Sequence, residues 1–370
     1  MTARLVCLPG DGIGPEVLNA ALRVLEAVSY HFNLDVVTEH AEIGGAAIDA
    51  CGTPLPNKTA ALCEQADAIL LGAVGGPKWN ALKAEKRPER GLLDLRYRLN
   101  LFGNLRPIHP VPGTTQSSPI QPEILDGVDM LIVRELSSGI YFGERVYQPT
   151  FAYDTAAYTA DEISRVVRLA ARFAQQRHCS LTLVDKANVL ATSRLWRNVA
   201  TRIMKAEFPE VALDCMLVDA AAMQIISNPS RFDVIVTDNL FGDILSDSAA
   251  VLTGSLGLLP SASLSEAKAA LYEPVHGSAP DLAGRQCANP VGMIRSVALM
   301  LRYSLNAPDA ASSLEEAVNS VLRDGPRTPD LAGKGESVTT TDELADHIIN
   351  QFRSKKDVRT PAHAPGTDTQ

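Results

Sequence analysis

Residues 5–30 read LVCLPGDGIGPEVLNAALRVLEAVSY and contain the pattern of a strand, a tight turn and a helix. Residues 5–8 are a short apolar run closed by a Pro-Gly pair, which is typical of a buried strand. Apolar residues then recur at helical spacing from Pro15, and a proline at the first helical position loses no hydrogen bond. This stretch predicts one strand–helix unit of an α/β fold.

The same alternation continues along the chain. Further buried strands are expected at residues 68–71, 130–133, 181–184 and 234–236, and helices at residues 161–177, 193–207, 244–257, 293–305, 312–323 and 342–353. Turn-rich segments are expected at residues 72–80, 103–122, 225–232 and 258–262. Strands that alternate with helices predict an α/β architecture with much parallel sheet.

Length and charge limit the classes of function. The chain has 370 residues, a length typical of two domains. It carries 34 Lys and Arg against 43 Asp and Glu, which gives a net charge of −9. Nucleic acid or an anionic membrane surface would require a broad basic face, so we expect neither as a partner. A small anionic substrate is compatible with this charge, because a few local arginines suffice to bind it.

The cysteines and the N-terminus indicate a cytoplasmic protein. The six cysteines are scattered and include no CxxC pair, so we expect neither a disulfide framework nor a zinc site. The N-terminus lacks the basic and long apolar regions of a signal peptide. No apolar stretch approaches the ~18–20 residues that would span a bilayer.

The glycine-rich turn at residues 10–14, GDGIG, follows a strand and opens a helix. The dinucleotide-binding fingerprint of Rossmann folds would need its third glycine at position 15, which is Pro15. The turn is therefore not a Rossmann fingerprint. A tight strand-to-helix turn and a contact with a ligand both explain the glycines.

Segment 238–247, DNLFGDILSD, carries the strongest chemical signal. Asp243 and Asp247 are one helical turn apart, so their carboxylates share a face and could hold Mg²⁺ or Mn²⁺. The alternative is ordinary acidic charge at a helix N-terminus. Asp219 ends an apolar run at residues 216–218 and is either a third metal ligand or a helix cap.

Three arginines stand at the ends of predicted strands or loops. Arg96, Arg106 and Arg134 suit a substrate with several carboxylates, because the planar guanidinium donates two parallel hydrogen bonds. Each could also be an ordinary solvated arginine. The neighbouring Leu92 and Leu93 either form an apolar pocket or pack in the core.

Two further segments offer acid–base groups and hydrogen-bond donors. Tyr141 lies in a glycine-rich bend, and Lys186 follows a buried strand, where burial lowers the pKa of an amine. They are a candidate acid and base, although the residues alone favour Tyr141 as an ordinary aromatic residue of the bend. Segment 273–281, EPVHGSAPD, is either an adenosine-binding loop or a structural one.

Taken together, these segments resemble the β-hydroxyacid oxidative decarboxylases of the isocitrate/isopropylmalate dehydrogenase family. The resemblance extends from residue 5 to about residue 352. The motifs that carry it are LPGDGIGPEV, GAVGGPKW, RPERGLLDLR, NLRP, RELSSGIYFGE, VDKANVL, NLFGDILSD, GSLGLLPSASL and EPVHGSAPDLAG. Their number, order and spacing are specific, whereas any one of them alone is not.

The resemblance implies an α/β fold of two domains that is not a Rossmann fold. A discontinuous cofactor-binding domain would comprise residues 1–101 and 254–352. Residues 102–253 would form an inserted domain that binds substrate and makes the contact of a homodimer with shared active sites. Residues 353–370 are expected to be a disordered tail, because they contain almost no large apolar residues.

The resemblance also implies roles for individual residues. The three arginines would bind the substrate carboxylates, and Tyr141 and Lys186 would be catalytic, Lys186 acting from the partner chain. Asp243 and Asp247 would bind Mg²⁺ or Mn²⁺. Asp219 of the second subunit would contact both the metal and the substrate. Leu92 and Leu93, with Glu89, would face an isopropyl group and the nicotinamide. The residues expected to bind NAD are Glu89, His276, Gly277, Ser278, Ala279, Asp281 and Asn289. Asp281 favours NAD over NADP, because a carboxylate repels a 2′-phosphate.

The implied reaction is the NAD-dependent oxidative decarboxylation of (2R,3S)-3-isopropylmalate to 4-methyl-2-oxopentanoate, a step of leucine biosynthesis. The chain departs from the family pattern at Ser137-Ser138, where Thr-Gly is usual. A paralogue acting on another alkylmalate or 2-hydroxy diacid therefore stays open. A non-catalytic regulatory paralogue is a second alternative, which the retained catalytic residues disfavour. An unrelated metal-dependent hydrolase or transferase is a third, which leaves the arginines unexplained.

Overall fold

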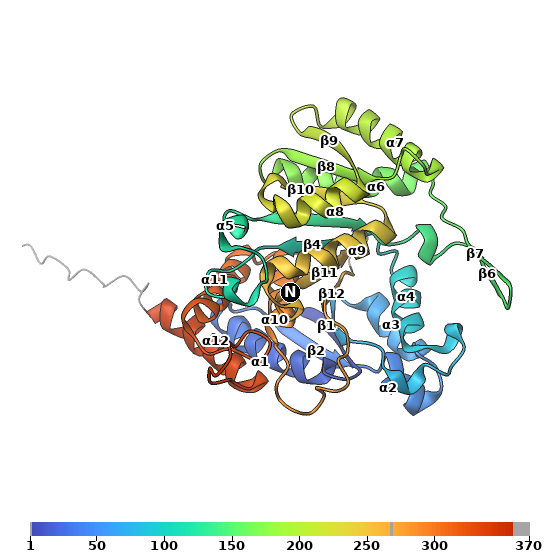
Figure 1. The fold of residues 1–370 in the computed structure, drawn as a ribbon. Helices are drawn as coiled ribbons and strands as arrows, with labels where there is room; N and C mark the ends of the chain where they lie inside the picture. The colour runs from blue at the N-terminus through green and yellow to red at the C-terminus, as the bar shows by residue number, and fades with distance from the viewer. Residues whose placement is uncertain (1, 267–268, 358–370) are drawn as a thin grey trace, which may run out of the picture.

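The computed structural model describes residues 2–266 and 269–357. Its strands are β1 (Ala3–Gly10), β2 (Val36–His40), β3 (Ala68–Ala73), β4 (Gly103–Ile108), β5 (Met130–Glu135), β6 (Arg145–Gln148), β7 (Phe151–Asp154), β8 (Ser180–Asp185), β9 (Ala212–Leu217), β10 (Val234–Thr237), β11 (Pro260–Leu264) and β12 (Leu271–Pro274). Ten of them form one sheet that runs through the molecule in the order β2-β1-β3-β12-β11-β4-β5-β10-β8-β9 (Figure 1). The hairpin β6–β7 projects from the body as an arm.

The α-helices are α1 (Gly14–Phe32), α2 (Gly44–Cys51), α3 (Asn57–Gln65), α4 (Pro88–Arg98), α5 (Pro122–Leu125), α6 (Ala160–Gln175), α7 (Ala191–Glu207), α8 (Val218–Ser227), α9 (Asn239–Ala249), α10 (Val291–Tyr303), α11 (Pro308–Asp324) and α12 (Thr341–Asp357). They cover both faces of the sheet, because strand side chains alternate between two buried clusters. On β5, for example, Leu131 and Val133 join the cluster with α1, α6 and α10, whereas Met130 and Ile132 join the cluster with α8 and α9. None of the described helices is both long and apolar enough to cross a membrane.

The predicted strand–helix unit at the N-terminus is confirmed as β1 and α1. A Cβ on Gly14 would stand 2.3 Å from the carbonyl oxygen of Pro9 and 2.7 Å from the backbone nitrogen of Ala73. Glycine is therefore needed where the turn packs against β3. This close approach explains Gly14 without any ligand.

Two segments that were predicted as turns are strands at the middle of the sheet, so that prediction was wrong. β4 lies within the predicted turn segment 103–122, and β11 begins in the predicted turn segment 258–262 and ends at Leu264. The two strands pair antiparallel with each other. Their sequences, GNLRPI and PSASL, contain proline and small polar residues in place of an apolar run. Their strand conformation comes from long-range pairing, which local propensity does not report.

Two predicted helices have different ends. Residues 244–257 were expected as one helix, but α9 begins at Asn239 and ends at Ala249. Two short 3₁₀ turns follow, separated by Gly254 with a φ of 86°. Helix α12 continues to Asp357, five residues into the segment expected to be disordered. The remainder of that segment, residues 358–370, lies outside the described residues.

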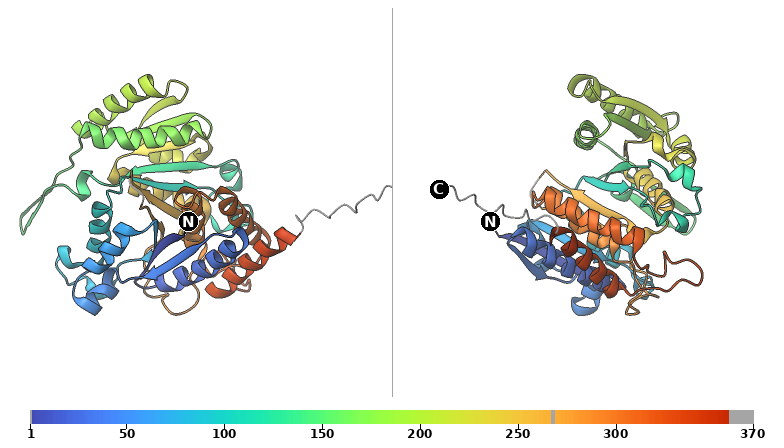
Figure 2. Two further views of the ribbon diagram at one scale, coloured as in Figure 1. Left: turned by 180° about the vertical axis from the view of Figure 1, so that it is seen from behind. Right: turned by 90° about the vertical axis from the view of Figure 1, so that its left-hand side faces the viewer.

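The order of the strands is compatible with the expected division into two domains, which stays a prediction. Strands of the two terminal segments occupy one half of the sheet, from β2 to β11, and strands of the inserted segment occupy the other, from β4 to β9. Helix α12 returns to pack beside α1 (Figure 2). Arg23 of α1 pairs there with Asp342 at 3.3 Å.

Substitution of Gly14 by Ala should lower the free energy of unfolding by about 2–3 kcal/mol, because the new methyl group overlaps backbone atoms of two strands. Urea denaturation followed by circular dichroism measures the change. Gly277→Ala is the matched control, since a Cβ there meets no atom within 4 Å. Equal stability of the two variants would contradict the close approach.

Candidate active site

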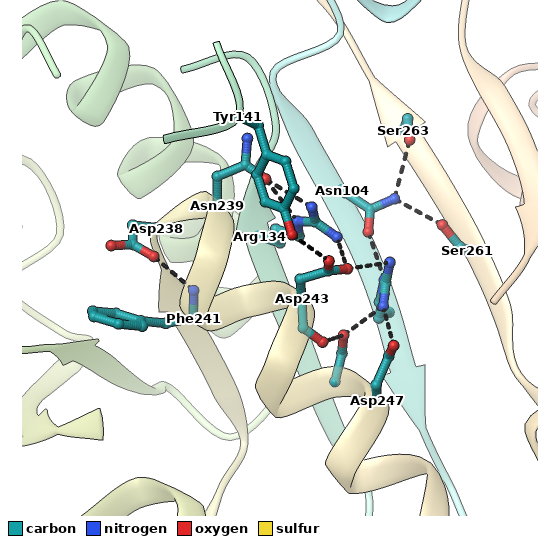
Figure 3. Close-up of polar contacts among 12 residues, drawn as sticks. Asn104, Arg134, Tyr141, Asp238, Asn239, Phe241, Asp243, Asp247, Ser261 and Ser263 are labelled. Carbon is teal, nitrogen blue, oxygen red and sulfur yellow. Dashed lines mark hydrogen bonds and ion pairs between the residues drawn. The ribbon is translucent and has the colours of Figure 1, made fainter. Parts of the chain in front are cut away.

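Helix α9 places the two aspartates of the predicted metal motif. Asp238 caps the helix, its side chain accepting the Phe241 backbone N–H at 2.8 Å. The helix then directs Asp243 and Asp247, one turn apart, towards strands β4 and β5 (Figure 3). The predicted shared face is confirmed, although the helix begins earlier than expected.

Two of the three predicted arginines meet these aspartates. Arg134, at the end of β5, forms an ion pair with Asp243. Arg106, on β4, reaches Asp247 at 2.8 Å and Asp243 at 3.4 Å. Both guanidinium groups are largely buried. The structure therefore brings together side chains from three distant segments.

Amide side chains that sequence reasoning missed hold the two arginines. Asn104 accepts the Arg106 Nε–H at 2.9 Å and donates to Ser261 Oγ at 2.7 Å. Asn239 accepts from Arg134 Nε at 3.0 Å and from Nη2 at 2.8 Å. The sequence signal that could have indicated Asn104 and Asn239 is a polar residue within an apolar segment or just after a predicted strand. Such a residue is expected to be buried, and buried polar groups need hydrogen-bond partners.

Arg96, on α4, contributes a third cation. Its Nη2 donates to Glu273 on β12 at 2.8 Å, and both side chains are 12% exposed. Its Nε is buried without a hydrogen-bond partner in the described structure. An unpaired guanidinium donor is costly, so an incoming carboxylate would stabilise it. Glu273 had no predicted role.

Neighbouring charges and burial set the ionisation of the cluster. Burial and, to a smaller extent, the neighbouring Arg106 lower the pKa of Arg134 to about 10, although Asp243 opposes the change. Burial alone would raise the pKa of Asp243, but Arg134 and then Tyr141 and Arg106 outweigh it and lower the pKa. The three guanidinium groups are matched by three carboxylates, since Glu273 pairs with Arg96 while Asp243 and Asp247 pair with Arg106 and Arg134.

Tyr141 stands beside the carboxylates in a state suited to donate a proton. Its hydroxyl donates to Asp243 Oδ2 at 2.8 Å, and its ring lies 5.5 Å from the Arg134 guanidinium carbon. Burial raises the pKa of Tyr141, and the hydrogen bond to Asp243 raises it further. The phenol is therefore protonated at neutral pH.

A cavity of about 550 Å³ adjoins Tyr141 between α4 and the segment 137–145. Leu93 and Glu89 line it, together with arginines of both segments. Leu92 instead packs at the edge of the buried cluster under α4. The two adjacent leucines, which were expected to act together, thus face different surroundings.

Lys186 and Asp219 lie together, with the Lys186 ammonium 2.5 Å from the Asp219 carboxylate. Asp219 is 63% exposed on its side chain. Within residues 2–266 and 269–357, no group of three His, Cys, Asp or Glu side chains is arranged to hold a metal. Asp243 and Asp247 offer the hard oxygen atoms that Mg²⁺ prefers, but a complete coordination shell needs ligands from elsewhere.

The segment EPVHGSAPD packs against the first glycine-rich turn. The Ile13 backbone N–H donates to the Ser278 carbonyl oxygen at 2.8 Å. His276 Nε2 is buried without a partner in the described structure, and burial lowers the pKa of this histidine. Gly277 and Asp281 are exposed. A neutral imidazole with a free nitrogen beside exposed backbone suits the recognition of an adenosine.

Asn289 also has a structural role in this loop. Its side chain accepts the Val291 backbone N–H at 3.0 Å and donates to Asp330 at 3.0 Å. Asp330 additionally accepts from Ser255. Asp330 was missed from the sequence, because it reaches the loop only through the fold.

Comparison with known proteins identifies the family. The family model described as isocitrate/isopropylmalate dehydrogenase matches residues 4–348. The chain belongs to this family. The chain is 50% identical over 363 residues to a 3-isopropylmalate dehydrogenase of Halalkalibacterium halodurans, covering 97% of this chain and 100% of that protein. It is 51% identical over 358 residues to the enzyme of that name from Heyndrickxia coagulans, covering 96% and 98% of the two chains.

Solved structures of this dehydrogenase family have the same fold. An isocitrate dehydrogenase from Methylococcus capsulatus aligns with a TM-score of 0.84 and 36% identity, covering 95% of this chain and 99% of that one. A beta-decarboxylating dehydrogenase from Thermococcus kodakarensis aligns with a TM-score of 0.79 and 34% identity, covering 98% and 100%. The predicted family and the α/β fold class are confirmed.

The helix cap at Asp238 should make stability depend on pH. Burial raises the pKa of Asp238 to about 6 in the folded protein. The folded state therefore binds the proton more tightly than the unfolded state, and stability falls as pH rises from about 4 to 6. Asp238→Asn keeps a capping side chain and removes this titration.

The stability of Asp238→Asn relative to the unsubstituted protein should therefore rise over the same pH interval and stay level above it. Urea denaturation at several pH values measures the difference. Asp126→Asn, at an exposed position, is the control. A difference that does not change with pH would contradict the raised pKa.

Proposed function

We propose that this chain oxidises and decarboxylates 3-isopropylmalate to 4-methyl-2-oxopentanoate with reduction of NAD, in leucine biosynthesis. The observation that carries the proposal is the cluster of Arg106, Arg134, Asp243 and Tyr141, in a chain about half identical to proteins named 3-isopropylmalate dehydrogenase. The cytoplasmic location expected from the sequence belongs to this proposal.

The arginines would bind the two carboxylates of the substrate. Arg96 has a buried Nε without a hydrogen-bond partner in the described structure, which a substrate carboxylate would fill. Leu93 lines the adjoining cavity, where it would contact the isopropyl group. Glu89 lines the same cavity and would lie towards the nicotinamide.

Asp243 and Asp247 would hold Mg²⁺ or Mn²⁺, with Asp219 contributed by a second copy of the chain. The exposure of Asp219 supports this, because its side chain, although paired with Lys186, is accessible to a neighbouring molecule. Such a metal lowers the pKa of a bound hydroxyl and stabilises the negative charge of an enolate. NAD would lie against the loop of His276, with Gly277, Ser278, Ala279, Asp281 and Asn289.

The protein side chains would move the protons. Lys186 of the second subunit would accept the proton of the substrate hydroxyl as hydride leaves for NAD. Tyr141, which retains its proton at neutral pH, would protonate the carbon that loses carboxylate. Asp243 orients the phenol through the hydrogen bond at 2.8 Å.

The proposed homodimer is supported by exposed apolar side chains on the inserted segment. A solvent-exposed group of this kind is typical of an interaction surface. It comprises Tyr147, Phe151 and Tyr153 on the arm and Val189, Leu190, Met223 and Ile244 on the body. Lys186 and Asp219 belong to the same inserted segment, so a dimer formed through it would be compatible with shared active sites.

NADH formation by the purified protein tests the reaction. The assay compares 3-isopropylmalate with isocitrate, tartrate and malate, with Mg²⁺ or Mn²⁺ and with EDTA, and NAD with NADP. Preferred, metal-dependent turnover of 3-isopropylmalate with NAD is expected. A preference for isocitrate would reject 3-isopropylmalate as the substrate. Absence of turnover with every substrate, in a protein that is an intact dimer, would indicate a non-catalytic paralogue.

Asp243→Asn should lower kcat at least about 100-fold, because the carboxylate would contact both the metal and Tyr141. The free energy of unfolding should fall by about 1–3 kcal/mol, since Arg134 loses its charged partner. Steady-state kinetics and urea denaturation measure the two effects. Asp214→Asn, at a mostly exposed aspartate of β9, is the control. Unchanged metal-dependent turnover would remove Asp243 from the proposed metal site.

Leu93→Ala should reduce the preference for 3-isopropylmalate over malate in kcat/KM by about 10-fold, because part of the apolar wall is lost. Leu92→Ala is the matched comparison and should chiefly lower stability, since Leu92 packs against the core. If Leu92→Ala alters the preference and Leu93→Ala does not, the roles of the two leucines are reversed.

A further inference from the structure

A second cavity, of about 360 Å³, lies away from the proposed active site, and we call it the rear cavity. Its charged and polar lining includes Arg177, Arg295 and Arg302, with His109, Asp129 and Glu315. Arg177 follows α6 of the inserted segment, whereas Arg295 and Arg302 lie on α10 of the C-terminal segment. The rear cavity therefore lies between the two parts of the chain.

Strand directions place the rear cavity at the opposite edge of the sheet from the active-site cluster. Asp129 immediately precedes β5, and Arg134 is near the end of that strand. Five residues of strand span about 15–20 Å. His109 directly follows β4, which runs antiparallel to β5, so it lies at the same edge as Asp129. No residue of the substrate cluster lines this cavity.

The cations of the rear cavity are unequally neutralised. Arg177 pairs with Asp233 at 2.7 Å and with Asp129 at 3.0 Å. Arg302 pairs with Glu315 at 2.7 Å. Two of the three arginines therefore have carboxylate partners within the protein.

Arg295 has only neutral acceptors among the described residues. Its Nη2 donates to Asn319 Oδ1 at 2.8 Å, and its Nη1 is 3.5 Å from the Leu258 carbonyl oxygen. Burial lowers the pKa of Arg295 to about 10, and the Glu315 carboxylate, which is itself paired with Arg302, only partly opposes this change. A buried cation that has no carboxylate of its own within ion-pair distance is unfavourable, and a bound anion would offset the cost.

Apart from Asn319, the rest of the lining is mainly apolar. Leu299 and Tyr303 of α10 line the rear cavity, and Pro107 and Pro260 of the two central antiparallel strands complete it. The volume is at the lower limit of ordinary ligand pockets. A single guanidinium whose hydrogen-bond acceptors are neutral, beside such a wall, matches one carboxylate joined to a short apolar group.

We propose that the rear cavity binds a small monocarboxylate with a short apolar group, held by Arg295 through its carboxylate. The apolar group packs against Leu299 and Tyr303. Because the cavity has walls from both parts of the chain, the ligand links them and stabilises their arrangement. This site is independent of the proposed reaction, since it contains none of the residues assigned to substrate, metal or NAD.

Thermal unfolding without NAD, metal or substrate tests the site. The probes are 3-methylbutanoate, acetate, inorganic phosphate and chloride, compared at equal ionic strength. A saturating concentration of 3-methylbutanoate should raise the melting temperature by about 1–2 °C, because the ligand binds the folded state. Acetate should raise it less, and phosphate should raise it no more than chloride.

Two substitutions at the rear cavity are expected to abolish this rise. Arg295→Met removes the guanidinium. Asn319→Asp supplies an internal carboxylate at the 2.8 Å contact, so it should stabilise the free protein while excluding the probe. Arg323→Gln, at an exposed arginine of α11, is the control and should keep the full rise.

The alternative outcomes overturn the proposal in distinct ways. An equal rise in all variants would place the probe elsewhere, for example at the substrate arginines. No rise above that of chloride in the unsubstituted protein would remove the site. A larger effect of phosphate than of 3-methylbutanoate would reject the monocarboxylate class. The dehydrogenase assay is unaffected by any of these outcomes, so the two proposals fail separately.

Discussion

The antiparallel register of β4 against β5 is the constraint on which the proposed active site depends. It sets Asn104 opposite Arg134, and Asn104 in turn accepts a hydrogen bond from Arg106. A slip of one residue would turn every side chain of β4 to the other face of the sheet. Arg106 would then leave Asp243 and Asp247. Because β4 also pairs with β11, the same strand joins the sheet halves formed by the inserted and terminal segments.

Charge balance connects the chemistry of the site with its stability. Arg134 tolerates burial because Asp243 and Asn239 occupy its donors. Arg96 keeps one buried donor unpaired, which is unfavourable in the free protein and favourable once a carboxylate arrives. The same reasoning applies to Arg295 in the rear cavity, whose partners are neutral. The molecule thus leaves selected cations incompletely paired at two separate places.

The departure from the family pattern at Ser137-Ser138 is incorporated into a hydrogen-bond network. Ser137 Oγ bonds to the buried Glu135 carboxylate, and Ser138 Oγ bonds to Glu162 of α6. Glu162 also completes the capping box of that helix. These bonds tie the loop of Tyr141 to α6, so the two serines have structural partners. None of the proposed proton-transfer groups is replaced by this departure.

The sequence by itself determined the elements whose periodicity is local: β1 and α1, the apolar strands, and the shared face of Asp243 and Asp247. The family motifs added the candidate residues of the active site. Only the tertiary structure decided that β4 and β11 are strands and that Leu92 packs against the core while Leu93 lines the cavity. It also decided that Arg96 pairs with Glu273, which is 177 residues away in the sequence. The reason is physical, because helix and strand patterns arise from neighbouring residues, whereas these features depend on pairing, burial and charge contacts between segments distant in the chain.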